Sequence, residues 1–197
     1  GERLIDLVLT TQELVRMIKE AGIDFANLPD TEPDDPFAEY TGAGVIFGAT
    51  GGVTEAVIRH VLGTVTAEQI ASVAECGVRG LEGIKAFEVK AGDLTLKIAV
   101  ANGLGNADKL IEKIESGEEF FHFVEIMACP GGCIGGGGQP SADIAQKRIR
   151  TQGIFNADEK CTLRSVEQNT ALDLVYALLR GRAHDLLHVH YPDHGHE

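Results

Sequence analysis

The residues best suited to chemistry are two cysteines, Cys129 and Cys133, in a glycine-rich stretch. Six of the eight residues from 131 to 138 are glycine, the residue that loses the most backbone freedom on folding. Such a run is useful where the backbone must wrap closely around a bulky group, because its exposed N–H groups can donate hydrogen bonds to cluster sulfur or other anionic ligands. We therefore interpret the loop as a site where two thiolates hold a metal-containing group.

Two other interpretations of this loop are weaker. A flexible surface loop would rarely follow the apolar run 120–127 or expose free thiols. A structural zinc site would need four Cys or His ligands, usually in C-x-x-C pairs, and the C-x-x-x-C spacing fits it less well. The chain has four cysteines, which could form two disulfides, but a chain of this size does not need them. Cys76 and Cys161 are interpreted as buried or incidental thiols.

The elements that position the loop follow from hydrophobic periodicity and from turn residues. A buried strand over 120–127 leads directly into the cysteines. The other predicted elements are a helix over 12–20 capped by Thr10 or Thr11 and ended by Gly22, a loop over 27–41, a helix from Gly52 to about Leu62, a hairpin of 84–90 with 94–100, and helices over 106–116, 141–153 and 168–180. Alternating strands and helices indicate an α/β layer structure, and no linker divides residues 1–197, so we expect one compact unit.

Composition and charge exclude several classes of partner. Apolar residues make up 44% and charged residues 24% of the 197 residues, as in a soluble globular protein. The formal net charge of −13 disfavours binding to nucleic acids and to anionic membrane surfaces. No apolar run approaches the roughly 20 residues that cross a bilayer, and the first residues lack a signal-peptide pattern.

The cysteine loop also resembles a known motif. The stretch Met127-Ala128-Cys129-Pro130-Gly131-Gly132-Cys133, followed by Gly136-Gly137-Gly138-Gln139-Pro140, is similar to the third cysteine motif of FeFe (iron-only) hydrogenases. Residues 41–53 resemble the glycine-rich segment that lines the same active site, and residues 9–25, 78–85, 100–104 and 184–191 are also similar to family sequences. The resemblance covers essentially the whole chain and implies one lobe of the H-cluster domain, an α/β unit with a mixed or parallel sheet flanked by helices.

The resemblance implies a cofactor and a role for four residues. The H-cluster is a 4Fe-4S cluster joined through a cysteine sulfur to a di-iron subcluster, which carries CO, CN and a bridging dithiolate amine. By motif position, Cys129 would ligate the cube and Cys133 would bridge the cube and the di-iron unit. Met127 and Phe47 would pack against the di-iron unit, although ordinary core packing would also explain each of them.

The resemblance also implies missing parts. A cube needs four ligands, and the two family motifs that supply the others, Thr-Ser-Cys-Cys-Pro and Met-Pro-Cys, are not in the sequence. The expected function is therefore reversible oxidation of H2 only when another chain or an upstream segment supplies that half, with ferredoxin, NAD or another carrier taking the electrons. A split subunit, a fragment and a relative with another role all fit; the last would be a non-catalytic H2 sensor or iron–sulfur scaffold. The expected compartment is the oxygen-poor cytoplasm, or the periplasm if the chain is exported with a partner.

Other candidates carry less weight. Gly42-x-Gly44 and Gly48 before a helix could hold a dinucleotide phosphate, but their spacing departs from G-x-G-x-x-G. The C-terminal histidines could bind a metal but more often pack or cap a chain end; they are His184, His188, His190, His194 and His196. Glu55, His60 and Glu125 are interpreted as ordinary residues of a helix or a strand.

Overall fold

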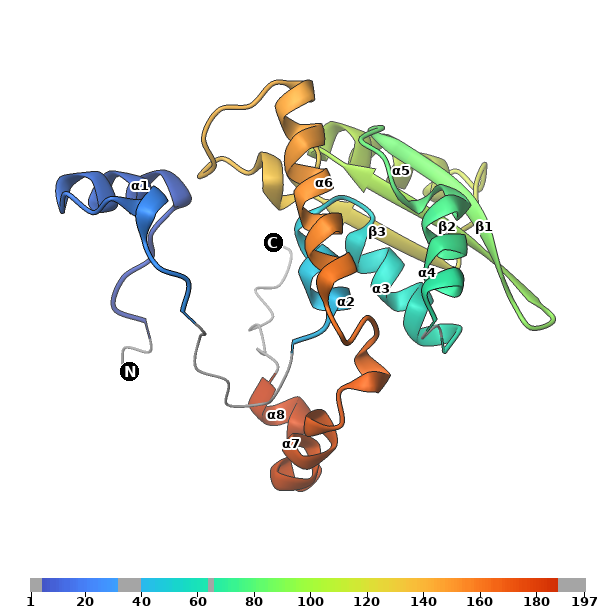
Figure 1. The fold of residues 1–197 in the computed structure, drawn as a ribbon. Coiled ribbons are helices and arrows are strands. Elements are labelled where there is room, and N and C mark those ends of the chain that lie inside the picture. The colour runs from blue at the N-terminus through green and yellow to red at the C-terminus, as the bar shows by residue number, and fades with distance from the viewer. Residues whose placement is uncertain (1–4, 32–39, 64–65, 188–197) are drawn as a thin grey trace.

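The computed structural model describes residues 5–31, 40–63 and 66–187, and its fold is α/β with a three-stranded mixed sheet (Figure 1). Strand β1 (Ile84–Ala91) pairs antiparallel with β2 (Leu94–Asn102), and β2 pairs parallel with β3 (Phe123–Met127). Gly92, with φ of 61°, supplies the left-handed backbone of the tight turn between β1 and β2. The predicted fold class and hairpin are confirmed.

Helices cover both faces of the sheet. Helix α5 (Leu104–Glu115) connects β2 to β3, and its Leu110 packs against Ala99 and Ala101 on one face. The opposite face carries Ile98, which packs with residues of α3 (Gly52–Val61), α4 (Ala67–Val73) and the π-helical turn η3 (Ala74–Val78). Helix α4 was not predicted, although Thr66 and Gln69 form a capping box at its start.

A second small core lies beside the sheet, under the long helix α6 (Ile144–Lys160). Helix α6 packs against the short helix α2 (Gly42–Val45) and the 3-10 turn η2 (Ile46–Gly48), with Ile46 and Phe155 buried between them. The predicted helix over 141–153 therefore exists but runs to Lys160, because Asp143 caps its start and Phe155 extends its buried face. The chain continues through η5 (Val166–Gln168), α7 (Ala171–Leu179) and α8 (Ala183–Leu187).

Helix α1 (Thr11–Glu20) is capped by Thr10, one of the two threonines predicted as the cap, in a capping box with Glu13. It is followed by the 3-10 turn η1 (Phe25–Asn27). None of the residues of α1 is buried, and Figure 1 draws it apart from the sheet. Its apolar side chains are exposed, including Leu14 at 49% and Met17 at 49%. Its capping predicts where the helix starts, but its apolar stripe has no core to pack on in the described part of the chain.

The prediction of a buried strand over 120–127 is only partly right. The strand begins at Phe123, Phe120 is 65% exposed and Ile126 is 45% exposed. The reason is that β3 lies at an edge of the sheet and pairs only with β2 among the described strands. None of the described helices is long and apolar enough to cross a membrane. His184 lies in α8, and the other C-terminal histidines lie outside the described residues.

Candidate metal centre

The cysteine loop leaves the sheet where two parallel strands end side by side. Asn102 ends β2 and is the register partner of Met127, which ends β3. The Asn102 side-chain oxygen accepts a hydrogen bond from the Gly131 N–H at 2.9 Å, and the Gly103 N–H donates to the Met127 carbonyl at 2.8 Å. Carboxyl ends of parallel strands are the usual place for ligand sites in α/β sheets. The sheet thus fixes the first half of the loop.

Two left-handed glycines turn the chain between the cysteines. Gly131 and Gly132 both have φ of 91°, and the Gly132 N–H donates to the Cys129 carbonyl at 3.0 Å. A side chain at Gly132 would have no room, because its Cβ would lie 2.7 Å from the Thr50 nitrogen and 2.9 Å from the Met127 sulfur. Glycine is therefore required there by both conformation and space. The 3-10 turn η4 (Cys133–Gly135) follows directly.

The loop closes back on the glycine-rich segment around residue 50. The Thr50 N–H donates to the Gly131 carbonyl at 3.1 Å, and η2 contacts η4. The structure therefore places the cysteine loop, which follows Met127, next to the turn that carries Phe47. Phe47 itself is 48% exposed rather than packed in a core.

An open cavity of about 510 Å³ lies beside the second cysteine. Cys133, which is exposed, lines it together with Gly48, Gln139 and Arg150. Cys129, Met127 and Phe47 are not among its lining residues, so the four predicted site residues share a neighbourhood and not one cavity. Cys129 is half-buried, and all four cysteines of the chain are free thiols. The structure therefore contains neither of the two disulfides that the cysteine count allowed.

Two thiols are all the cysteine ligands that this loop offers. Among the described residues, no group of three or more His, Cys, Asp or Glu lies close enough to hold a metal ion. Cys76 packs against the core under the sheet, where burial raises the pKa of its thiol. The Cys161 thiol donates to the Ala157 carbonyl at the end of α6, and burial raises its pKa as well. Neither thiol lies in the cysteine loop.

Glu125 holds the turn in front of α3, a role that the sequence interpretation missed. Its carboxylate accepts hydrogen bonds from the Gly51 N–H, the Thr54 N–H and the Thr54 hydroxyl, each at 2.7 Å. Glu125 does lie in strand β3, but its strand position alone does not account for these three hydrogen bonds. Because the carboxylate occupies the N-terminal donors of α3, a phosphate has no free place there, which argues against the dinucleotide alternative.

Lys85 holds the same turn from the other side. Its buried ammonium donates to the carbonyls of Val78 at 2.7 Å, Gly80 at 3.0 Å and Thr50 at 3.4 Å. Burial lowers the pKa of Lys85, and the nearby charge of Glu125 opposes part of that shift. Lys85 and Glu125 are both register partners of Val100, so the two charges stand in one row across the sheet, facing the turn.

Helix α6 and the start of α1 contact the far side of the cysteine loop. Arg150 donates to the carbonyls of Ile134 and Pro140, and Lys147 donates to the carbonyl of Pro130 at 3.2 Å. Gln12 donates from its backbone to the Gly138 carbonyl at 3.1 Å and from its side chain to the Gln139 carbonyl at 2.7 Å. The loop is thus held by the sheet, by α6 and by α1.

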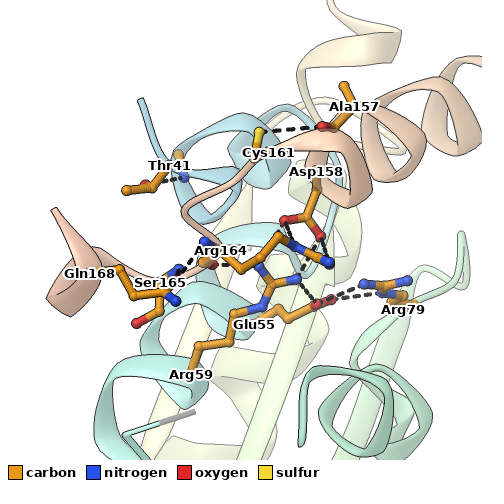
Figure 2. A network of polar contacts seen from close by, with 11 residues as sticks. Thr41, Glu55, Arg59, Arg79, Ala157, Asp158, Cys161, Arg164, Ser165 and Gln168 are labelled. Atoms are coloured by element: carbon orange, nitrogen blue, oxygen red, sulfur yellow. Dashed lines mark hydrogen bonds and ion pairs between the residues drawn. The ribbon is translucent and has the colours of Figure 1, made fainter. Parts of the chain in front are cut away.

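A buried ion network joins α3 to α6 (Figure 2). Arg59, which is fully buried, donates to Asp158 at 2.9 and 2.8 Å and to Glu55 at 2.6 Å. Arg79 also binds Glu55, and Arg164 also binds Asp158. Burial opposes ionisation of Asp158, but the hydrogen bonds from Arg59 and Arg164 outweigh it and lower the pKa of Asp158.

Glu55 is a residue of α3, as the sequence interpretation has it, but its place in this buried network was not predicted. The i, i+4 spacing of Glu55 and Arg59 was the signal in the sequence that could have found the pair. His60, on the same helix, is exposed and contacts Glu167 of η5. No chemistry is implied by that surface contact.

Family models match nearly all of the chain. The model described as iron only hydrogenase large subunit, C-terminal domain, matches residues 1–137, and the model described as iron hydrogenase small subunit matches residues 143–194. The NADP-reducing hydrogenase subunit HndD of Solidesulfovibrio fructosivorans is 45% identical over 97% of the chain and 34% of its own length.

Two further relatives belong to different classes, one a hydrogenase and the other an iron–sulfur assembly protein. The solved structure of a variant of [FeFe]-hydrogenase HydA1 from Chlamydomonas reinhardtii is 40% identical, with a TM-score of 0.73, over 95% of this chain and 55% of that chain. The cytosolic iron-sulfur assembly component 3 of Pongo abelii is 33% identical over 79% of the chain and 35% of its own length. The chain thus spans about a third of these curated relatives and just over half of the solved hydrogenase.

Proposed function

The chain belongs to the iron-only hydrogenase family, and from that premise we propose that it supplies one half of a hydrogenase active site. The observation that carries this proposal is the close approach of the cysteine loop to its neighbours: the Thr50 N–H donates to the Gly131 carbonyl, and Gly132 lies too close to Thr50 and the Met127 sulfur to accept a side chain. Two reduced thiols on such a backbone suit an iron–sulfur cluster, for which cysteine thiolates are the standard ligands.

The donor set fits half of an H-cluster. The chain offers two thiols at the loop, whereas a 4Fe-4S cube takes four ligands, so we propose that the other half of the domain supplies the remaining ligands. When bound, the complete cofactor, including its di-iron subcluster with CO, CN and a bridging dithiolate amine, supplies the reversible conversion of H2 into two protons and two electrons. The ferredoxin, NAD or other carrier that exchanges those electrons would also bind outside this chain.

In this proposal, the residues of this chain would bind the cofactor and shield it from water. Cys129 and Cys133 would hold the cofactor, with Cys129 as a ligand of the cube and Cys133 as the ligand nearer the di-iron unit. Met127 contacts the turn between the two cysteines, and Phe47 projects from the adjacent turn with half of its surface open. Closing the second half of the domain over these two side chains would exclude water from the site and strengthen its electrostatic interactions. We propose a reducing, oxygen-poor cytoplasm as the compartment, which suits the four free thiols.

A second candidate function is a non-catalytic iron–sulfur scaffold or H2 sensor. The observation that favours it is the 33% identity to an iron–sulfur assembly component over most of the chain. Such a protein would use the same two thiolates to hold a cluster without turning over H2. Cluster content alone therefore does not separate the two functions, and hydrogen turnover does.

The test is a chimera in which this chain replaces the matching part of Chlamydomonas HydA1, whose remaining segment supplies the other half. We expect the matured chimera to bind iron and sulfide and to evolve H2 from reduced methyl viologen. Cys133→Ser should lower that rate by more than about 100-fold, because loss of a ligand exceeds the 10–100-fold cost typical of outer-shell changes. Cys161→Ser, at a cysteine outside the loop, is the matched control.

The outcomes separate the candidates. A chimera that binds iron and sulfide but evolves no H2 would favour the scaffold function. A Cys133→Ser variant that evolves H2 at the parental rate would contradict the role proposed for Cys133.

A further inference from the structure

We propose that Arg150 is a positioning residue that sets the place of Cys133 before any cofactor binds. One nitrogen of its guanidinium donates to the Ile134 carbonyl at 3.0 Å, and another donates to the Pro140 carbonyl at 2.9 Å. A single side chain thus joins the two ends of the segment 135–139, which is glycine except for Gln139.

The glycine segment needs such a fixed point. Gly137 has no neighbour within 4 Å of an added Cβ, so its side-chain position contributes no packing. Glycine loses the most backbone freedom on folding, so this run stays ordered only if other groups hold it. Hydrogen bonds from an ionised donor are stronger than neutral ones, and a guanidinium presents two parallel donors in one rigid plane.

The position of Arg150 links this segment to the thiol. Ile134 directly follows Cys133 in η4, so a fixed Ile134 carbonyl restricts the cysteine backbone. Arg150 and Cys133 also line the same cavity. The guanidinium is carried by α6, and the far end of that helix is anchored by the buried ion pair of Asp158 with Arg59. Arg150 therefore holds the cysteine loop at a fixed place relative to α6, which is itself anchored to α3.

Lys147, one turn earlier on α6, plays a smaller part. Its ammonium donates to the Pro130 carbonyl at 3.2 Å, between the two cysteines. It holds one carbonyl, whereas Arg150 holds two that are six residues apart. A lysine at position 150 cannot reproduce the fork, so the proposal predicts that Arg150→Lys does not restore what Arg150→Met loses.

The inference rests on the proposed function, because the loop that Arg150 orders is proposed to bind the cofactor. The first test of the inference does not need the cofactor. Amide hydrogen exchange in the 197-residue chain should be at least about tenfold faster over residues 133–139 in Arg150→Met and in Arg150→Lys than in the parent. Exchange in β2 and α5 should stay unchanged, which shows that the variants fold. Arg148→Met, at an exposed arginine of the same helix, is the matched control and should exchange like the parent.

The second readout is the iron retained by the chimera with HydA1. Arg150→Met should retain several-fold less iron than the parent chimera and the Arg148→Met chimera. Exchange within about twofold of the parent would overturn the proposal. Faster exchange with unchanged iron would overturn the role in placing Cys133. A parent chimera that binds no iron, with faster exchange in Arg150→Met, would overturn the proposed function while supporting the role of Arg150 in ordering the loop.

Discussion

At the scale of single residues, buried charged side chains next to the cysteine loop form hydrogen bonds to backbone groups, which fix the shape of the turn that contacts the loop. Glu125 accepts from Gly51 and Thr54, and Lys85 donates to the carbonyl of Thr50. The backbone N–H of Thr50, in the turn between them, donates a hydrogen bond to the carbonyl of Gly131 in the cysteine loop. Buried polar groups of this kind are costly when unpaired, so each fixes a single local geometry.

The lowered pKa of Lys85 predicts how stability depends on pH. Burial lowers its pKa in the folded state below the ordinary value of 10.5, so between the two values the unfolded chain binds more protons. The free energy of unfolding contributed by Lys85 therefore rises with pH through that window. Lys85→Met should remove this rise, by about 1.4 kcal/mol for each unit of the shift.

The measurement is urea unfolding of the parent and of Lys85→Met from pH 7 to pH 10.5. Subtracting the two curves cancels the opposite contributions of the Cys76 and Cys161 thiols, whose pKa values burial raises. Lys90→Met, at an exposed lysine of the same strand, is the control for the loss of one lysine from this strand. A difference curve for Lys85→Met that stays flat with pH would contradict the prediction.

At the scale of elements, the long helix α6 connects the cysteine loop to the rest of the molecule. One half of α6 holds the loop through Lys147 and Arg150. The other half is fixed to α3 through Asp158 and Arg59, with no solvent exposure of either side chain. The network crosses the boundary between the two family models, which lies between residues 137 and 143. It therefore joins the segment that resembles a large subunit to the segment that resembles a small one.

Breaking this network should loosen α6. Arg59→Met leaves the carboxylates of Glu55 and Asp158 buried without their shared partner, and we expect it to lower the free energy of unfolding by about 3–5 kcal/mol. Lys113→Met, which removes a solvent-exposed ion pair with Glu118, is the control and should change stability by less than about 1 kcal/mol. Urea unfolding at pH 7 measures both, and equal effects of the two variants would count against the network.

At the scale of the whole molecule, the fold has a packed centre and an unpacked arm. The sheet, α3, α4, α5, α6 and η3 carry buried side chains, whereas α1 buries none and contacts residues 138–139 through Thr11 and Gln12. The chain spans 55% of the solved HydA1 chain, so a relative of that length has further residues that could cover such an arm. We therefore expect the apolar side of α1 to pack against the other half of the domain.

The exposed Leu14 tests this expectation. Leu14→Ser should change the free energy of unfolding of the isolated chain by less than about 0.5 kcal/mol, because the side chain is not buried there. In the chimera with HydA1 the same change should cost about 1.5–3 kcal/mol, the value of burying a leucine. Thermal melting of both proteins measures the contrast, with Arg16→Ser as the polar control on the same helix. The same small effect in both proteins would contradict packing of α1 on the other half.

Local patterns in the sequence determined much of this protein. A threonine cap at Thr10 or Thr11 predicts the start of α1, and the alternating run 94–100 predicts a hairpin with 84–90. The cysteine motif predicts the family, which the comparisons confirm. These features depend on residues a few positions apart, whose interactions hold whatever the rest of the chain does. The roles of Cys129, Cys133, Met127 and Phe47 stay predictions that the chimera tests.

Only the tertiary structure decided which groups meet. Glu125 finds its partners 71 and 74 residues away, and Arg59 finds Asp158 99 residues away. A strand pattern does not say whether a polar side chain faces water or a helix end, nor that β3 lies at an edge. Those outcomes depend on how the sheet and α6 pack, because the cost of burying a charge is offset only by partners that the fold itself delivers.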